Sequence, residues 1–417
     1  MYNLSAVSIS AVGVVPSGKD ADALTAAGRV IGAALGHYLV WLGRAAAREG
    51  AQRLHFLSRE GAWLAIHYAR LRQLHPNGDA WPRPVTLAVS RRSTFLPSLA
   101  DVSQASLAPL LVQYKQVSAA TVLFSLGLNM SRSATVPVSI TSLPLDRPWA
   151  EAGVAQTILG DPWIAQTLEQ RRIAQRDALL SYLSQKEVMN CAPLTVADIG
   201  WSGTIQDNLA RLMPDRRLIG HYFALRPQRL RLPNNEKFGF ILGEQDQYRI
   251  GRRLRFVAPL EFIATDATTS ALEYVIEDGQ SRPVMDELVV APVSLPAFSI
   301  LQKGVEVGIV DAAFLTLPSA SLARSKVLKF LEAPPLALVN VFFEAWRDDR
   351  FGGGVLRRGA PPLCPKRLLL ALVKKAERRA LGIELAESGW PWGLLVRDMP
   401  FVAPLLRRLV LGFDARL

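Results

Sequence analysis

Residues 198–204, with the sequence DIGWSGT, combine small, hydroxyl-bearing and acidic side chains in the way that an anion site requires. The two glycines let backbone N–H groups converge on an anion, and the hydroxyls of Ser202 and Thr204 can donate hydrogen bonds to it. A helix predicted to begin near Ile205 would direct the positive end of its dipole at the same point. The segment therefore predicts a phosphate-binding turn, beside which Asp198 can accept hydrogen bonds from sugar hydroxyls.

A second segment of this kind, residues 58–61, has the sequence SREG and offers a cation and a carboxylate, Arg59 and Glu60. Arg91 and Arg92 follow the next predicted strand and add fixed positive charge. Two anion sites with a carboxylate between them suit a diphosphate donor that carries a further phosphate. Gly-containing turns before helices are common, so a purely structural turn is the alternative at each place.

The elements around these turns predict a parallel sheet. Helical periodicity over residues 20–49 ends at Gly50, and the apolar run LHFL that follows predicts a strand. The segment AWLAIHYARLRQL is helical in pattern, and VTLAVSRR predicts the next strand. Strand, turn, helix and strand form a βαβ unit, in which ligands bind at the carboxyl ends of the strands.

Residues 101–190 are mostly helical in pattern and predict a large insertion into this alternation. Its last helix, roughly residues 163–188, is expected to turn a charged, solvated face outward. The charges on that face are Glu169, Arg171, Arg172 and Arg176.

Two further strands are predicted in PLTVADIG and RLIGHYFAL, and β-like pieces (KFGFILG, LEYVIEDG and LVVAPV) follow before a helical end. We place a boundary near residue 235. The expected fold is thus an α/β domain over residues 1–235, Rossmann-like with a parallel sheet, and an α+β or helical region over residues 236–417.

Composition limits the class of protein. The chain has 48 Lys plus Arg against 36 Asp plus Glu, a net charge of +12 that would attract phosphates, anionic lipid or nucleic acid. No nucleic-acid-binding signature accompanies the charge, so nucleic acid is the weaker interpretation. Cys191 and Cys364 stand in unrelated contexts, which indicates neither a disulfide framework nor a cysteine-based zinc site. Without a signal-peptide pattern at the N-terminus, a cytoplasmic location is expected.

Two segments raise the question of a membrane. The apolar stretch over residues 26–47 is interrupted by Arg29, His37 and Arg44, so it predicts a buried helix whose small residues, Gly32 among them, pack against the sheet. From residue 365 on, KRLLLALVKKAERRALG and FVAPLLRRLVLGF are basic and amphipathic. They would either lie on the anionic surface of the inner membrane or pack on the body of the protein, and both possibilities stay open.

The two turns resemble the phosphate loops of type I phosphoribosyltransferases. By that resemblance Ser58, Arg59, Glu60 and Gly61 would hold pyrophosphate. Residues 202–204 would hold the 5-phosphate of phosphoribosyl pyrophosphate (PRPP). The family usually has two adjacent acids before a TGxT loop, whereas this chain has Ala197 and Asp198 before a loop one residue tighter, which leaves the ribose and metal contacts open.

A resemblance that covers more of the chain rests on FLSREG, VSRR, DIGWSGTIQ and PLEFIATDATTSALEY. These segments are similar to a phosphoribosyltransferase-like module of bacterial capsule and O-antigen gene clusters, often fused to a haloacid-dehalogenase-like phosphatase. The resemblance implies a transferase that places 5-phosphoribose on a glycan, after which the phosphatase leaves ribofuranose. Because this chain has no DxDxT motif, the phosphatase is expected to be a separate polypeptide.

The expected reaction is transfer of 5-phosphoribose from PRPP, bound with Mg²⁺, to a hydroxyl of a lipid-linked saccharide, with inversion at the anomeric carbon. Glu60 and Asp198 are the candidate catalytic carboxylates, with Asp207 and Glu261 behind them as general bases. No protein-held metal site is expected. The expected binding residues are Ser58, Arg59, Gly61, Arg91, Arg92, Gly200, Trp201, Ser202, Gly203 and Thr204.

Two other functions remain open. A haloacid-dehalogenase-type phosphatase would use DIGWSGT as its acidic motif but needs an aspartate nucleophile that the sequence does not show. A non-catalytic scaffold of a glycan assembly complex would use the basic tail for docking and would not bind PRPP.

Overall fold

The computed structural model describes residues 16–113, 117–128, 137, 140, 142–228, 231–243, 246, 249–254, 256–264, 270–286, 296–348, 356–364, 366, 370 and 373–405. Outside these residues lie residues 1–15, the TDATT stretch, the segment LVVAPV and the part of the basic tail that follows residue 405. The β-like piece, the family motif and the signal-peptide interpretation that rest on them therefore stay predictions.

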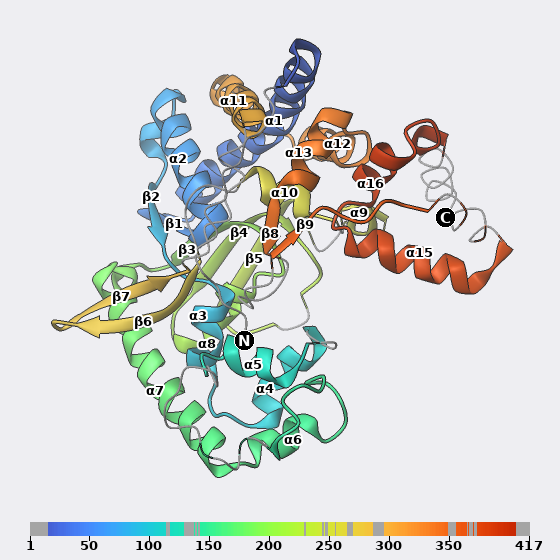
Figure 1. Ribbon diagram of the computed structural model, residues 1–417. Coiled ribbons are helices and arrows are strands. Elements are labelled where there is room, and N and C mark those ends of the chain that lie inside the picture. The colour runs from blue at the N-terminus through green and yellow to red at the C-terminus, as the bar shows by residue number, and fades with distance from the viewer. Residues whose placement is uncertain are drawn as a thin grey trace.

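A five-stranded, entirely parallel sheet forms the centre of the molecule, with strand order β2-β1-β3-β4-β5 (Figure 1). Its strands are β1 (Arg53–Leu57), β2 (Arg83–Leu87), β3 (Leu194–Trp201), β4 (Leu218–Leu225) and β5 (Asn235–Leu242). Strand β4 is buried along its whole length, as a strand covered on both faces must be. The predicted α/β class with a parallel sheet is confirmed.

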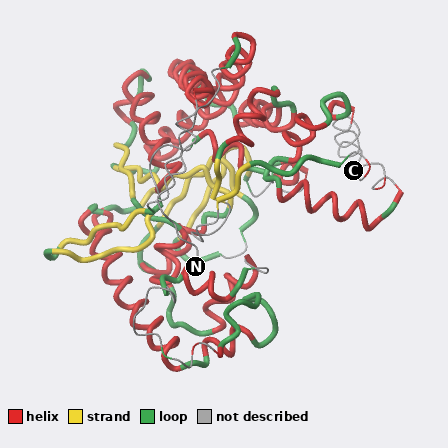
Figure 2. Tube along the Cα trace, viewed as in Figure 1, coloured by secondary structure: helices red, strands yellow, loops and turns green. Residues whose placement is uncertain are grey.

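Helices cover both faces of this sheet (Figures 1 and 2). One face packs against α1 (Gly18–Arg48) and α2 (Ser58–Leu74), through strand residues such as Phe56 and Ile199. The other face packs against α7 (Pro162–Gln185) and α8 (Thr204–Leu212), through Leu57 and Val196 among others, and α8 also contacts α3 (Arg91–Ser98). Successive side chains of a strand point to opposite faces of the sheet, so they pack into two separate cores.

The order of the strands reverses between β1 and β3. β2 lies on one side of β1 and β3 on the other, so the helices after β1 and β3 leave toward opposite faces of the sheet. In open parallel sheets, ligands bind at such a reversal, beyond the carboxyl ends of the strands. Residues 58–61 and 202–204 both begin there.

The chain between β2 and β3 is helical. It forms α3, α4 (Gln104–Gln113), α5 (Ala119–Ser125), α6 (Val154–Leu159) and α7. These helices enclose a small hydrophobic core of their own around Trp149 and Leu123. Short 3-10 turns lie at Gly78–Ala80, Val188–Asn190 and Asp311–Phe314.

The face of α7 that was expected to be solvated is not so throughout. Arg172 is buried, and its Nη1 donates to the carbonyl oxygen of Leu99 over 3.0 Å. Arg171 donates to the carbonyl oxygen of Leu126 and pairs with Glu273. The reason is that α7 contacts the other helices of the insertion and also the antiparallel hairpin of β6 (Ala271–Glu277) and β7 (Gln280–Met285).

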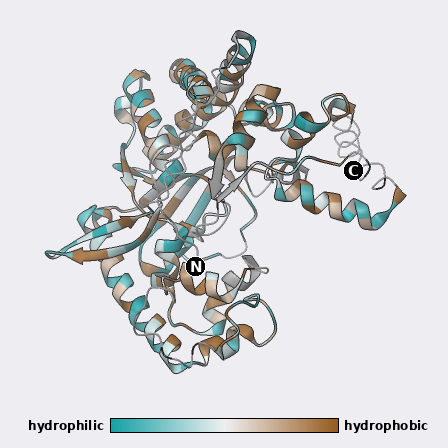
Figure 3. Ribbon diagram, viewed as in Figure 1, coloured by the Kyte–Doolittle hydropathy of each residue, from teal (hydrophilic) through white to brown (hydrophobic). Residues whose placement is uncertain are grey.

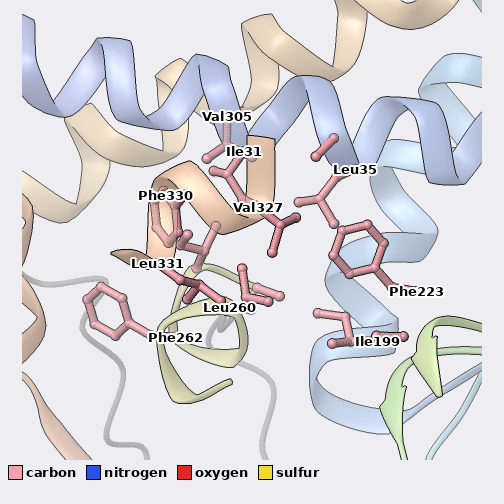
Figure 4. Packing of buried hydrophobic residues seen from close by; sticks show 14 of the residues in the cluster. Ile31, Leu35, Ile199, Phe223, Leu260, Phe262, Val305, Val327, Phe330 and Leu331 are labelled. Carbon is pink, nitrogen blue, oxygen red and sulfur yellow. The ribbon is translucent and has the colours of Figure 1, made fainter. Parts of the chain in front are cut away.

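The remaining elements extend the first core. They are α9 (Arg249–Arg253), α10 (Ala258–Ile263), α11 (Pro296–Val310), α12 (Ala320–Glu332), α13 (Leu336–Glu344), β8 (Trp346–Asp348), β9 (Leu356–Arg358), α15 (Lys375–Glu387) and α16 (Pro391–Asp398). In Figure 4, Ile31 and Leu35 of α1 pack beside Val305, Val327 and Leu331. Residues from both sides of position 235 therefore share one core, and β5, which starts at that position, belongs to the sheet.

Helix α1 is buried, as predicted, but its small residues pack chiefly on a helix. A Cβ atom at Gly32 would lie 2.2 Å from the carbonyl oxygen of Val305 in α11, and one at Gly308 would lie 2.4 Å from that of Arg29. The two backbones therefore touch, which corrects the expected contact of Gly32 with the sheet. Among the described helices, α1 alone is long and apolar enough to cross a membrane (Figure 3 colours the chain by hydropathy), and most of its apolar stretch is buried inside the protein.

Candidate active site at the carboxyl ends of β1 and β3

Three carboxyl groups from separate elements are coupled through their pKa values near the carboxyl ends of β1 and β3. They belong to Glu60 in the first turn of α2, Asp198 in β3 and Glu261 in α10. Burial raises the pKa of Asp198 well above its ordinary value, and the charges of Glu60 and Glu261 raise it further. Burial and Glu60 likewise raise the pKa of Glu261. The charged forms of Asp198 and Glu261 are therefore disfavoured, and a nearby cation would stabilise them.

Arg59 supplies part of the opposing charge. Its Nε donates to Glu60 Oε1 over 2.6 Å, and its charge lowers the pKa of Glu261. The backbone of Arg59 has φ 22° and ψ −92°, which breaks the helical geometry at the start of α2. Such a conformation costs roughly 1–3 kcal/mol and is maintained by its surroundings, as is common at functional sites.

The expected turn at residues 58–61 is thus the distorted first turn of α2, directly after β1. Ser58 is the first residue of α2. Gly61 is buried, and a Cβ atom there would lie 3.1 Å from the carbonyl carbon of Phe56. Glycine at this position lets the first turn of α2 approach the end of β1 closely.

The predicted turn at residues 198–204 begins later than expected, because β3 continues through Trp201. Only Ser202 and Gly203 lie between strand and helix, and Thr204 is the first residue of α8. Positive φ angles at Gly200 (117°), Trp201 (82°) and Gly203 (61°) turn the chain sharply here. Ser202, in the turn between β3 and α8, is exposed.

Trp201 is held by three contacts. Its indole Nε1 donates to Glu261 Oε1 over 3.0 Å, the Arg226 guanidinium lies 6.0 Å above the ring, and the Arg226 N–H donates to the Trp201 carbonyl oxygen over 2.7 Å. Because Trp201 is only 7% exposed, its ring is packed inside the protein. Its indole N–H orients the carboxylate of Glu261.

Asp198 is fixed by the adjacent backbone N–H and by helix α1. Its Oδ1 accepts from the N–H of Ile199 over 2.8 Å, and its carbonyl oxygen accepts from the hydroxyl of Tyr38 over 3.0 Å. Tyr38 belongs to α1 and also lies 2.9 Å from the carbonyl oxygen of His221 in β4. Helix α1 thereby sets the end of β3 relative to β4.

The two adjacent arginines of α3 have different surroundings. Arg91 is exposed, and its charge lowers the pKa of both Asp198 and Glu261. Arg92 donates to the carbonyl oxygen of Phe124 and lies 4.9 Å over that ring, within the helical insertion. The structure brings Arg91 to the carboxyl cluster, while Arg92 packs toward α5.

Other candidates also separate in space. The carboxylate of Asp207 lies 2.7 Å from the ammonium of Lys237, whose side chain is 1% exposed, so Asp207 forms a buried ion pair. Arg226, Tyr38 and Lys237 did not emerge from the sequence. Arg226 directly follows β4, and its place at the carboxyl end of a parallel strand was the signal that could have identified it.

A metal ion held by the protein alone does not fit the described residues, among which no three His, Cys, Asp or Glu side chains form a group that could hold one. Magnesium carried by a diphosphate has smaller requirements, usually one or two protein carboxylates. Asp198 and Glu60 are two carboxylates of this site, and the charge of Glu60 raises the pKa of Asp198.

In sequence comparisons, no protein-family model matches the chain, and no curated protein matches it.

Proposed function

We propose that the chain is a glycan phosphoribosyltransferase, which moves 5-phosphoribose from PRPP to a hydroxyl of a lipid-linked saccharide at the cytoplasmic face of a bacterial inner membrane. The observation that carries the proposal is that the two turns predicted to bind anions both start at the reversal point of a parallel sheet, where Glu60 and Glu261 raise the pKa of Asp198. A phosphoribosyltransferase type of this fold is part of the same proposal.

The donor would be bound at both ends. The strained turn at Arg59 suits the diphosphate together with Arg91, whose charge also lowers the pKa of Glu261, because guanidinium groups bind phosphate oxygens in a fixed fork. The turn at Ser202 and Gly203, at the N-terminus of α8, suits the 5-phosphate. Asp198 lies in β3, shortly before the second turn, and suits the ribose hydroxyls.

Bond changes in this reaction are simple. The acceptor oxygen forms a bond to the anomeric carbon, the bond from that carbon to the diphosphate breaks, and the diphosphate leaves with the electron pair. Magnesium bound with the donor would neutralise charge on the departing diphosphate. The ribose becomes positively charged as the bonds change, and the carboxyl cluster of Glu60, Asp198 and Glu261 stabilises such a charge.

A carboxylate also has to accept the acceptor's proton. The raised pKa values of Asp198 and Glu261 make these carboxylates stronger bases than exposed ones, and general-base catalysis contributes roughly 10²-fold to 10⁴-fold. Glu60, which accepts a hydrogen bond from Arg59, is the candidate ligand for the donor complex.

Phosphorus NMR of a reaction with PRPP, Mg²⁺ and membranes that contain lipid-linked saccharides tests this proposal. The proposal expects diphosphate release that depends on acceptor and falls at least 100-fold in Asp198→Asn. Release of inorganic phosphate alone would indicate the haloacid-dehalogenase-type hydrolase. No diphosphate release by either the unchanged protein or Asp198→Asn would favour a scaffold.

A further inference from the structure

The turn at Ser202 and Gly203 rests on a buried polar network between α8 and the sheet. Lys237 of β5 places its ammonium 2.7 Å from Asp207 Oδ1 and donates to the carbonyl oxygen of Ser202 over 3.4 Å. The amide of Asn235 donates to the same Asp207 oxygen over 2.8 Å. The lysine therefore joins strand, helix and turn at one point.

Two further residues complete the network. The hydroxyl of Tyr222 donates to Gln206 Oε1 over 2.7 Å, and Gln206 Nε2 donates to Asn235 Oδ1 over 2.8 Å and to the carbonyl oxygen of Glu236 over 2.9 Å. Gln206 and Tyr222 are fully buried. A buried ion pair needs partners for its remaining hydrogen-bonding groups, and here Asn235 donates to Asp207 while Lys237 also donates to Ser202.

The contact with Ser202 determines where the next N–H points. In a trans peptide, the C=O and the following N–H point in opposite directions. Because the Ser202 carbonyl points down to Lys237, the N–H of Gly203 points away from the network. Gly203 has φ 61°, and a Cβ atom there would lie 3.0 Å from both Lys237 Cδ and the Tyr222 hydroxyl, so the turn sits directly on these two side chains.

We infer that Lys237 is a positioning residue of the phosphate-binding turn, which directs the Gly203 N–H toward a phosphate monoester of the substrate. The inference rests on the proposed function. With a side chain 1% exposed, Lys237 itself does not touch substrate. Its charge is balanced by Asp207, so its effect on binding comes from the orientation of the turn.

The test uses the double variant Lys237→Met/Asp207→Asn, which removes both charges together and leaves no buried ion unpaired. Amide hydrogen exchange of a peptide covering residues 202–207 reports the order of the turn without ligand. Calorimetric titration with ribose 5-phosphate and with PRPP reports binding. We expect about 10-fold faster exchange in the turn and about 10-fold weaker binding of both ligands, the loss of one hydrogen bond to a charged phosphate.

Asn208→Ala is the matched control. Asn208 is equally buried and lies on the same helix, but its amide donates to Thr94 Oγ1 of α3 over 3.0 Å and does not contact the turn. This variant should lower stability while it leaves turn exchange and ligand affinity near those of the unchanged protein.

Wild-type exchange rates and affinities in the double variant would overturn the inference. The proposed function fails separately: if the unchanged protein binds neither ligand, the exchange experiment alone decides whether Lys237 orders the turn.

Discussion

The indole N–H of Trp201 donates to the carboxylate of Glu261 over 3.0 Å, which ties the end of β3 to α10 across 60 residues of sequence. Burial and Glu60 raise the pKa of Glu261, while Arg59, Arg91 and the Trp201 hydrogen bond lower it. The hydrogen bond therefore helps to hold together the carboxyl cluster on which the proposed chemistry depends.

Removing this donor should destabilise the protein. Trp201→Phe retains a ring but loses the hydrogen bond to a charged group, which is worth about 1.5–3 kcal/mol. The measurement is the free energy of unfolding in urea, relative to Trp149→Phe. Trp149 is fully buried, and none of the described residues accepts from its Nε1, so that control changes the ring without breaking a hydrogen bond. Equal losses in the two variants would show that the bond to Glu261 contributes nothing.

Arg59 should show opposed effects on stability and binding. Glycine tolerates positive φ, so Arg59→Gly should relieve the strain at φ 22° and raise the free energy of unfolding by about 1 kcal/mol, while it abolishes measurable PRPP binding. Arg59→Ala retains a Cβ and should lose binding without the gain in stability. Thermal unfolding and calorimetry of both variants check this, and a stability gain of the same size in Arg59→Ala would contradict the strain.

The raised pKa of Asp198 predicts how stability depends on pH. Since the folded state binds its proton more tightly than the unfolded state, the stability linked to this group is fully present below the ordinary pKa of 3.8 and is lost as pH rises through the folded value. Asp198→Asn removes the titration. Urea unfolding from pH 4 to pH 8 should show the variant gaining on the unchanged protein as pH increases. Parallel curves would contradict the burial of a destabilised carboxylate.

The close contact of α1 and α11 makes a further prediction. Gly32→Ala places a methyl group where the Val305 carbonyl oxygen lies and should destabilise the fold by about 1–3 kcal/mol. Gly382→Ala, in α15, meets nothing within 4 Å and should stabilise by about 0.5–1 kcal/mol. Thermal melting of the two variants separates packing from helix propensity. A stable Gly32→Ala protein would show that the helices can move apart.

Local patterns predicted the parallel sheet and the place of both turns, because strand alternation and glycine positions are readable over a few residues. The end of β3 could not be placed, since the positive φ of Trp201 follows from its contacts with Glu261 and Arg226, which are distant in sequence. The pairing of Asp207 with Lys237 is equally non-local. The small residues around Gly32 predict close packing, but no short pattern shows that the neighbour of Gly32 is helix α11 rather than a strand.

The most direct test of the central claim is calorimetric titration of the protein with PRPP in the presence of Mg²⁺, beside Arg59→Ala and Asp198→Asn and with ribose 5-phosphate as the partial ligand. The proposed donor site predicts saturable PRPP binding that is weakened in both variants, and weaker binding of ribose 5-phosphate that Arg59→Ala leaves nearly unchanged. Absence of PRPP binding by folded protein, or equal binding by all three proteins, would contradict it.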